Sequence, residues 1–437
     1  MFLDKELQIL AVKHGFYQRK SKFSPIKFFE MLMYSASQNE SCTLEQSSMM
    51  LKTSFKLDIT KQSLNARFND GSIKFVKEIL KRVIEKQLSK VINDKFLTQF
   101  NQIRIKDATR IVLPDRLKEY YKGYGGGSKE SSKAGICIQF EYDAKNGKIL
   151  SLDITHATRN DNTDAKETIT NVNSGDLILR DLGYYSLPNL ESIDNSDAFF
   201  ISRLGAKTNV YENEKILSFR ELYKTISINK QTCIEVNVIV GKKEQIPMRL
   251  VISIVPNDVY EKRIRKIDQR NKNHGYQTSD DYKYRCRFNL FITNIETQNL
   301  TKEQVLILYK LRWQIELMFK NWKSISKIDE IQPMKYARFT CVFIAKLILI
   351  VINIQLIWNF ASYYYQKNEK ILSIVKCFKT LQREAVIVIE ILRKKKKESE
   401  NNIKKIGKLF SSNHWTEKKK DSTNYEDILE LFICNSN

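Results

Sequence analysis

The sequence predicts an α/β protein in which a mixed-sheet core with a β-rich insertion lies between two helical regions. Strand-like runs of apolar residues are confined to residues 99–295, and the segments on either side show helical spacing. The chain has 437 residues, 42% of them hydrophobic, with only 14 Gly and 6 Pro. This length and composition are typical of a folded protein with two or three domains.

The charge of the chain predicts a polyanionic partner. The formal net charge is +23, so nucleic acid is the first candidate and an anionic membrane surface the second. The seven cysteines are widely spaced and include no CxxC pair, which argues against a disulfide framework or a zinc site. The start of the chain, MFLDKELQIL, lacks the pattern of a signal peptide, so we expect a reducing, cytoplasmic compartment.

Residues 1–98 are predicted to form a helical DNA-binding domain. Thr43 and Gln46 have the spacing of a capping box for a helix that runs to about Lys52, and Thr60 begins a second helix, KQSLNARF, after a short turn. Four polar residues would share the exposed face of the second helix and suit contacts with DNA bases and phosphates: Lys61, Gln62, Asn65 and Asn69. The alternative is an ordinary helical hairpin with a polar outer face.

Residues 99–360 are predicted to form the central domain. Its first five strands are expected at Ile103–Leu113, Ala134–Tyr142, Ile149–His156, Asp176–Asp181 and Ala198–Leu204. An Asn-Gly turn joins the second strand to the third as a hairpin, and a short helix is expected at Asp164–Val172. Three antiparallel strands, then a helix and further strands, is the order of an RNase H-like α/β core.

Residues 205–295 interrupt this order and are predicted to be a β-rich insertion. Cys233–Val240 and Met248–Val255 are expected to form a hairpin, and Arg287–Ile295 a further strand. Asp258–Lys283 is so polar that we expect an exposed loop or arm.

The segment Thr301–Lys323 is predicted to be one uninterrupted helix. Thr301 and Gln304 have capping-box spacing, and an apolar face recurs at intervals of 4, 3 and 4 residues: Leu311, Ile315, Met318 and Trp322. At 100° per residue, four polar residues fall within about 60° of one another on the opposite face: Tyr309, Arg312, Glu316 and Lys323. This stripe is either a solvated helix face with an Arg–Glu pair, or a carboxylate held among donors that bind phosphate.

Phe339–Phe360 is about as long as a membrane span. Three polar residues interrupt it and the surrounding chain is basic on both sides, so we expect a buried core helix and no membrane: Lys346, Asn353 and Gln355.

Residues 361–437 are predicted to be a basic helical C-terminal region. Lys367–Lys420 carries 16 basic and 6 acidic residues, including the run Arg393–Lys397. We expect these residues to contact the DNA backbone or to act through non-specific electrostatics. Glu426–Phe432 is a short amphipathic segment that suits a dimer contact.

Three carboxylates have positions that suit phosphodiester chemistry. Asp107 lies inside the first predicted strand, Asp181 at the carboxyl end of another, and Glu316 on the later helix. A carboxylate within a strand is costly unless it is paired or binds metal, and open α/β sheets bind ligands at the carboxyl ends of their strands. Three other acids near the core are candidates to replace Asp107: Asp153, Asp161 and Asp164.

The surroundings of these carboxylates form recognisable motifs. The polar stripe reads Tyr-x2-Arg-x3-Glu-x6-Lys, Asp107-Ala-Thr is followed by Leu113-Pro114, and Asp181 begins Asp-Leu-Gly-Tyr-Tyr. Together they resemble the motifs of bacterial DDE transposases of the insertion-sequence-four family, including its Tyr-Arg-Glu-Lys signature. Ala108 departs from the usual Ser or Gly of the first block. The resemblance covers roughly residues 100–360.

The resemblance implies a cut-and-paste DNA transposase with an RNase H-like fold. Asp107, Asp181 and Glu316 would be the catalytic residues and metal ligands, with two Mg²⁺ ions for which Mn²⁺ can substitute. Phosphates at the element's ends would be bound by three further residues: Tyr309, Arg312 and Lys323. The implied partners are double-stranded DNA, as terminal inverted repeats and as target, and a second subunit in a synaptic dimer. The implied location is the bacterial cytoplasm, at the nucleoid.

Two other readings share these residues. A structure-specific nuclease on the same fold would cut DNA without strand transfer, and an inactive relative would only bind DNA. Trp313 and Trp322 could stack on a flipped base, although core packing is favoured for Trp322.

Overall fold

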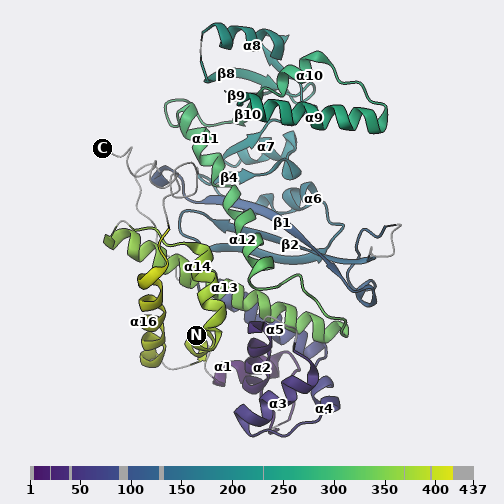
Figure 1. The fold of residues 1–437 in the computed structure, drawn as a ribbon, viewed down its shortest axis with the longest axis vertical. Coiled ribbons are helices and arrows are strands. Elements are labelled where there is room, and N and C mark those ends of the chain that lie inside the picture. Colours follow the sequence, from purple (N-terminus) through teal and green to yellow (C-terminus); the bar gives the residue numbers. More distant parts are fainter. Residues whose placement is uncertain are drawn as a thin grey trace. The chain divides into compact units, whose positions relative to one another are not determined.

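A computed structural model of the chain describes residues 4–19, 21–38, 42–87, 97–126, 132–229, 231–368, 370–393 and 396–416. These residues form two compact units. Unit 1 contains the described parts of Met1–Ile92, Ala108–Arg159 and Glu316–Ser422, and unit 2 those of Asn93–Asp107 and Asn160–Ile315. Both units combine strands with helices, so the predicted α/β class is confirmed (Figure 1).

Unit 1 begins with helices α1 (Asp4–Lys13), α2 (Pro25–Ser37), α3 (Leu44–Phe55), α4 (Lys61–Asn65) and α5 (Asp70–Glu85). The predicted capping box of α3 is present, because Thr43 and Gln46 each accept a hydrogen bond from the other's backbone N–H. The second predicted helix is shorter than expected. It ends at Asn65, because the side chain of Asn69 accepts the backbone N–H of Ser72 and so caps α5.

The strands of unit 1 are β2 (Ala134–Asp143), β3 (Ile149–His156) and the second half of β1 (Ile103–Leu113), in the order β3-β2-β1. β2 and β3 pair as the predicted antiparallel hairpin. The remaining helices are α12 (Trp313–Ser324), whose first three residues belong to unit 2, α13 (Tyr336–Asn368), α14 (Ile374–Arg383), α15 (Ala385–Arg393) and α16 (Lys396–Asn413).

Helix α13 is the core helix of unit 1. Its 33 residues are long and apolar enough to cross a membrane, but 83% of its most apolar window is buried inside the structure. It packs against α2 and α5, where Gln355 donates a hydrogen bond to the carbonyl of Val83 and Ser72 lies 3.4 Å from the thiol of Cys341. This burial fits the expected core helix.

Unit 2 is built on a mixed sheet. The first half of β1 pairs in parallel with β4 (Leu177–Arg180), and β4 pairs in parallel with β5 (Phe199–Arg203). Beyond β5 the described strands pair antiparallel, in the order β10 (Phe288–Thr293), β9 (Ile246–Ile254), β8 (Cys233–Val240), β6 (Val210–Glu212) and β7 (Lys215–Ile216). The region predicted as an insertion therefore extends the same sheet from β5 outward.

The helices of unit 2 are α6 (Asp161–Glu167), α7 (Leu187–Asp194), α8 (Phe219–Ile228), α9 (Asn257–His274), α10 (Asp280–Arg285) and α11 (Lys302–Lys310). The prediction of a loop at Asp258–Lys283 is wrong, because most of this segment forms α9 and α10. No residue of α9 is buried. Ion pairs between residues four apart, such as Lys262–Asp258 at 3.2 Å, support this solvated helix, and Gly275 ends it with a φ of 67°.

The predicted single helix at Thr301–Lys323 is also wrong, since α11 ends at Lys310 and α12 begins at Trp313. At the break, the backbone N–H groups of Leu311, Arg312 and Gln314 bond to carbonyls three residues earlier. Such bonding turns the chain through about 120° per residue instead of about 100°. The side chains of Tyr309 and Arg312 therefore point in almost the same direction around the helix axis. The angles calculated for one continuous helix do not apply to the residues after Arg312.

Candidate active site

Asp107, on β1, and Asp181, the residue that follows β4, take adjacent positions beside the parallel pair of strands in unit 2. The register of β1 and β4 ends with Lys106 opposite Arg180. The residue that follows each of these two is an aspartate. Neighbouring strands lie about 4.8 Å apart, so the two carboxylates start from adjacent backbone positions. The pairing depends on the parallel register, because a shift of one residue would turn the side chains to opposite faces.

The other face of β1 holds two buried cations that are paired with acids. Arg104 lies 3.1 Å from Asp176, and the ammonium of Lys106 contacts Asp164, with side chains between 1% and 5% exposed. Because side chains alternate along a strand, these pairs lie on the face opposite Asp107. Asp164 is thus engaged away from Asp107 and Asp181.

The other two alternative acids also have defined positions. Asp161 begins α6, and its carboxylate oxygen would lie 3.1 Å from a Cβ added at Gly183. It therefore borders the short turn Leu182–Tyr184 that follows Asp181. Asp153 lies in unit 1 on β3, opposite Gln139, and is exposed.

Two residues of the Tyr-Arg-Glu-Lys signature lie beside the aspartate pair. The hydroxyl of Tyr309 donates a 3.2 Å hydrogen bond to the carbonyl of Arg180, the residue before Asp181. Arg312 places a guanidinium nitrogen 3.6 Å from the carboxylate of Asp107 and lies 5.9 Å from the ring centre of Tyr309. Both residues are buried, so they form a wall beside the carboxylates.

The environment of Tyr309 keeps its phenol protonated. Its pKa is raised to about 12, mainly by burial; the charge of Arg312 lowers this pKa and the negative charge of Asp181 raises it. A phenol with such a pKa is a hydrogen-bond donor at neutral pH and not a base.

The other two signature residues belong to unit 1. Glu316 is half-buried in the first turn of α12. Lys323, in the last turn, donates a 3.4 Å hydrogen bond to the carbonyl of Arg110 on β1. Among the residues that the structure describes, no three His, Cys, Asp or Glu side chains converge on a point that could hold a metal ion. The structure therefore brings together Asp107 and Asp181 with Tyr309 and Arg312.

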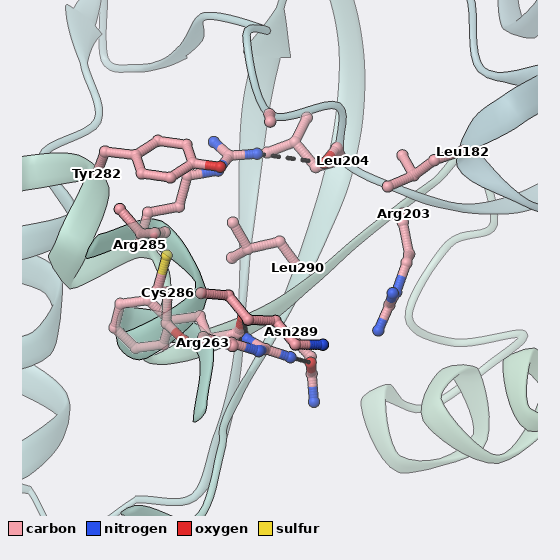
Figure 2. Close-up of a pocket in the computed structure, with 13 residues that line it drawn as sticks. Leu182, Arg203, Leu204, Arg263, Tyr282, Arg285, Cys286, Asn289 and Leu290 are labelled. Atoms are coloured by element: carbon pink, nitrogen blue, oxygen red, sulfur yellow. Dashed lines mark hydrogen bonds between the residues drawn. The ribbon is translucent and has the colours of Figure 1, made fainter. Parts of the chain in front are cut away.

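A basic pocket of about 340 Å³ begins at Leu182, directly after Asp181. Four cationic side chains line it, and none of the described residues that line it is acidic: Arg203 of β5, Arg263 and Lys266 of α9, and Arg285 of α10. Figure 2 shows Arg285 bonded to Leu204 and Arg263 bonded to Asn289. Sequence reasoning missed this pocket because it treated α9 as a loop, although Arg263, Lys266 and Ile267 have helical spacing.

The two best-fixed arginines of the basic pocket are partly desolvated. Arg263 donates to the carbonyls of Cys286 and Phe288 at 3.0 and 2.8 Å. Burial, and then the nearby charge of Arg203, lower its pKa below the ordinary arginine value. Burial also lowers the pKa of Arg285. A pocket that holds like charges together in this way favours an anionic ligand.

The predicted DNA-reading residues of unit 1 lie on α4. Lys61 and Gln62 are exposed and Asn65 is half-buried. Lys61 forms a 3.2 Å ion pair with Glu45 of α3. Asn69 caps α5, where its side chain accepts the backbone N–H of Ser72, so it is not available to contact DNA as predicted.

The two tryptophans differ in exposure. Trp322 is 1% exposed and packs edge-on against Phe140 and Phe319, with ring centres 4.9 and 5.1 Å away. Core packing, the favoured reading for Trp322, is therefore confirmed. Trp313 is 54% exposed and remains accessible to a ligand.

Two regions with predicted roles are only partly described. Arg393–Lys397 lies mostly outside the residues whose side chains the structure describes, and Glu426–Phe432 lies wholly outside the described residues.

Comparisons with known proteins identify the family. Residues 98–353 match the family described as Transposase DDE domain. The transposase for insertion sequence element IS231F of Bacillus thuringiensis subsp. israelensis is 32% identical over 86% of this chain and 82% of its own length. The transposase for insertion sequence element IS1151 of Clostridium perfringens is 28% identical over 86% of this chain and 83% of its own length. A solved piggyBac transposase synaptic complex with hairpin DNA covers 96% of this chain and 83% of its own at 10% identity, with a TM-score of 0.42.

The chain therefore belongs to the DDE transposase family, and it is a DNA transposase of the insertion-sequence type. The predicted family and enzyme class are confirmed.

Proposed function

We propose that this transposase cuts DNA at the ends of its insertion sequence and joins the freed ends to target DNA, with Asp107, Asp181 and Glu316 as its catalytic carboxylates. The observation that carries the proposal is the register of β1 and β4, which makes Asp107 and Asp181 neighbours. Glu316 is assigned from the Tyr-Arg-Glu-Lys signature: its Arg312 contacts Asp107, and its Tyr309 bonds to the carbonyl of Arg180, the residue before Asp181.

The donor set suits divalent cations. Mg²⁺ is commonly held by one or two carboxylates together with water and substrate phosphate. Two such ions, with Mn²⁺ as a substitute, would supply activation of the attacking oxygen and stabilisation of the leaving oxygen. The protein's own contribution is to hold the carboxylates in place, and Arg312 does so for Asp107.

The remaining signature residues are proposed to bind the phosphates of the cut end. Arg312 offers a planar fork of donors that suits a phosphate, and Lys323 offers a point charge. Tyr309 stays protonated and positions the backbone before Asp181. The basic pocket is proposed to hold the backbone of the DNA strand next to the cut, because Leu182, which lines it, directly follows Asp181.

The proposed layout assigns one task to each part of the chain. Residues 1–98 bind DNA, with Lys61, Gln62 and Asn65 facing the terminal inverted repeats. Residues 99–360 form an RNase H-like catalytic domain, which the strand orders β3-β2-β1 in unit 1 and β1-β4-β5 in unit 2 support. Residues 361–437 form a basic helical region. The protein would act in the cytoplasm on nucleoid DNA, as a dimer that holds both element ends.

The test uses purified protein, Mg²⁺ and a labelled duplex that carries the element's end. Wild type is compared with Asp107→Asn, Asp181→Asn and Glu316→Gln, and with Asp329→Asn as a matched control at an exposed position. We expect cleavage and joining in wild type and in the control, and loss of at least about a thousandfold in the three variants without loss of DNA binding.

Three outcomes would contradict the proposal. Cleavage without joining would favour a structure-specific nuclease. DNA binding without metal-dependent chemistry in wild type would indicate an inactive relative. Full activity in any of the three variants would remove that carboxylate from the site.

A further inference from the structure

A second cavity lined by cations lies in unit 1, among the C-terminal helices. This C-terminal cavity measures about 500 Å³ and lies between the end of α12, the helix α14 and the end of α16. Four cationic side chains and one histidine line it, and none of the described residues that line it is acidic: Lys327, Lys376, Lys379, Arg383 and His414. The proposed chemistry does not use any of them.

The backbone fixes His414 over α14. The N–H of Ser373 donates a 2.7 Å hydrogen bond to the carbonyl of His414, and Leu372 forms a β-bridge with Trp415. The ammonium of Lys376 also donates to the carbonyl of Trp415 at 3.3 Å. The segment after α16 is therefore held against the start of α14, and this gives the C-terminal cavity a defined wall.

A chain of hydrogen bonds links Arg383 to His414. Arg383 donates to the hydroxyl of Thr380 at 3.2 Å, and that hydroxyl lies 2.6 Å from Nε2 of His414. Because the hydroxyl oxygen of Thr380 accepts from Arg383, its O–H can donate a hydrogen bond to Nε2 of His414. The imidazole then acts as an acceptor and is neutral. Thr380 is only 3% exposed, so the chain is built into the cavity wall.

The charges around His414 disfavour its protonated form. Burial and then Arg383 lower its pKa below the ordinary histidine value, and Lys376 adds a smaller effect of the same sign, while a hydrogen bond to the backbone of Leu409 opposes them. Lys379 also lines the cavity, while Lys327 is paired at 2.7 Å with Glu330. An anion in the cavity would reverse this balance, since it would attract the cations and favour the imidazolium.

We propose that the C-terminal cavity binds a backbone phosphate of duplex DNA, with Lys379 and Arg383 as its charged donors and His414 as the group that takes up a proton when the phosphate enters. DNA is the favoured source of the phosphate because the protein is a transposase with a net charge of +23. The inference rests on the proposed function in taking DNA as partner, but it concerns binding outside the catalytic carboxylates.

The first test measures DNA affinity against salt concentration, without divalent metal, so that cleavage plays no part. The probe is a fluorescent duplex, and the variant is Lys379→Gln/Arg383→Gln. Each phosphate that the protein no longer neutralises reduces the steepness of log K against log salt by about 0.9, so a decrease of about 0.9 is expected for the single phosphate proposed here. The matched control is Lys215→Gln/Lys224→Gln, which removes the same charge from exposed positions in unit 2. Its slope should match wild type.

The second test follows the same affinity from about pH 8 to about pH 5.5, a range that includes the ordinary histidine pKa of about 6.5. Since the phosphate favours protonated His414, affinity should rise more steeply on acidification in wild type than in His414→Gln. The comparison cancels the contributions of the other histidines.

Conservative variants distinguish phosphate binding by Lys379 and Arg383 from a purely structural role of these residues. Lys379→Arg/Arg383→Lys keeps both charges and should retain the wild-type slope, provided that circular dichroism shows a folded protein. Equal slopes in the cavity variant and the surface control, or identical pH profiles for wild type and His414→Gln, would overturn the proposal. If wild type neither cleaves nor joins DNA but the slopes of the cavity variant and the surface control still differ as expected, the result would count against the proposed function alone.

Discussion

The contact between Arg312 and Asp107 is predicted to hold a catalytic carboxylate in position. The perturbation is Arg312→Met, which keeps an unbranched apolar stem of similar reach but removes the guanidinium. Asp107→Asn and the double variant complete a double-mutant cycle, which isolates the energy of this pair from the other contacts of each residue. Arg312→Lys serves as a control that keeps the charge but loses the planar fork.

The expected magnitude follows from the geometry. The charged atoms lie 3.6 Å apart, and the side chains are 10% and 19% exposed. With an effective dielectric constant of about 20, the Coulomb attraction at that distance is about 4.6 kcal/mol. Desolvation of both groups offsets more than half of it, so we expect a coupling energy of about 2 kcal/mol. Arg312→Met alone should cost about 3 kcal/mol, because it leaves a partly buried carboxylate without this cation.

The assay is equilibrium unfolding in urea, followed by circular dichroism at a pH near 7, for the four members of the cycle. Arg312→Lys should recover about half of the loss. A coupling energy below about 0.5 kcal/mol would refute the reasoning, because residues that do not interact are additive to within that value. It would mean that Arg312 does not hold Asp107 in the native state.

Three further predictions concern buried groups. Trp322→Ala should lower the free energy of unfolding by about 3–5 kcal/mol in urea titrations and Trp322→Phe by less, because the indole is 1% exposed between two phenylalanine rings; DNA affinity of the folded variant should match wild type. Lys106→Met should cost about 3–5 kcal/mol by removing the buried partner of Asp164, and adding Asp164→Leu should restore most of it in the same titrations. Because the pKa of Tyr309 is raised to about 12, wild type should lose stability relative to Tyr309→Phe as the pH rises from about 10 to about 12, and equal urea midpoints across that range would argue against this burial.

The strands of this protein could be predicted closely from its sequence. The bounds of β1, β3 and β8 agree with the predicted segments, because apolar alternation and turn residues mark strand ends directly. The neighbouring positions of Asp107 and Asp181 could not be read in this way. They depend on the parallel register of β1 and β4, which joins residues about seventy positions apart and leaves no local pattern.

The helix that carries Glu316 shows where periodicity fails. The apolar positions Leu311, Ile315 and Trp322 are buried as the spacing predicts, and this spacing continues through the break between α11 and α12. The break is visible only in backbone hydrogen bonds and in the tertiary contact of Arg312 with Asp107, to which no residue spacing points. A face calculated for a straight helix therefore does not give the relative directions of the side chains on either side of the break.

The distribution of positive charge is more informative about function than its total. A net charge of +23 predicts a polyanionic partner but not where it binds. In the basic pocket, burial and then the nearby charge of Arg203 lower the pKa of Arg263. Bringing like charges together in a desolvated site costs stability, and folding alone gives no reason to do so. A bound phosphate reverses that cost, so the cations that repel one another in the free protein are the ones that a DNA backbone would stabilise most.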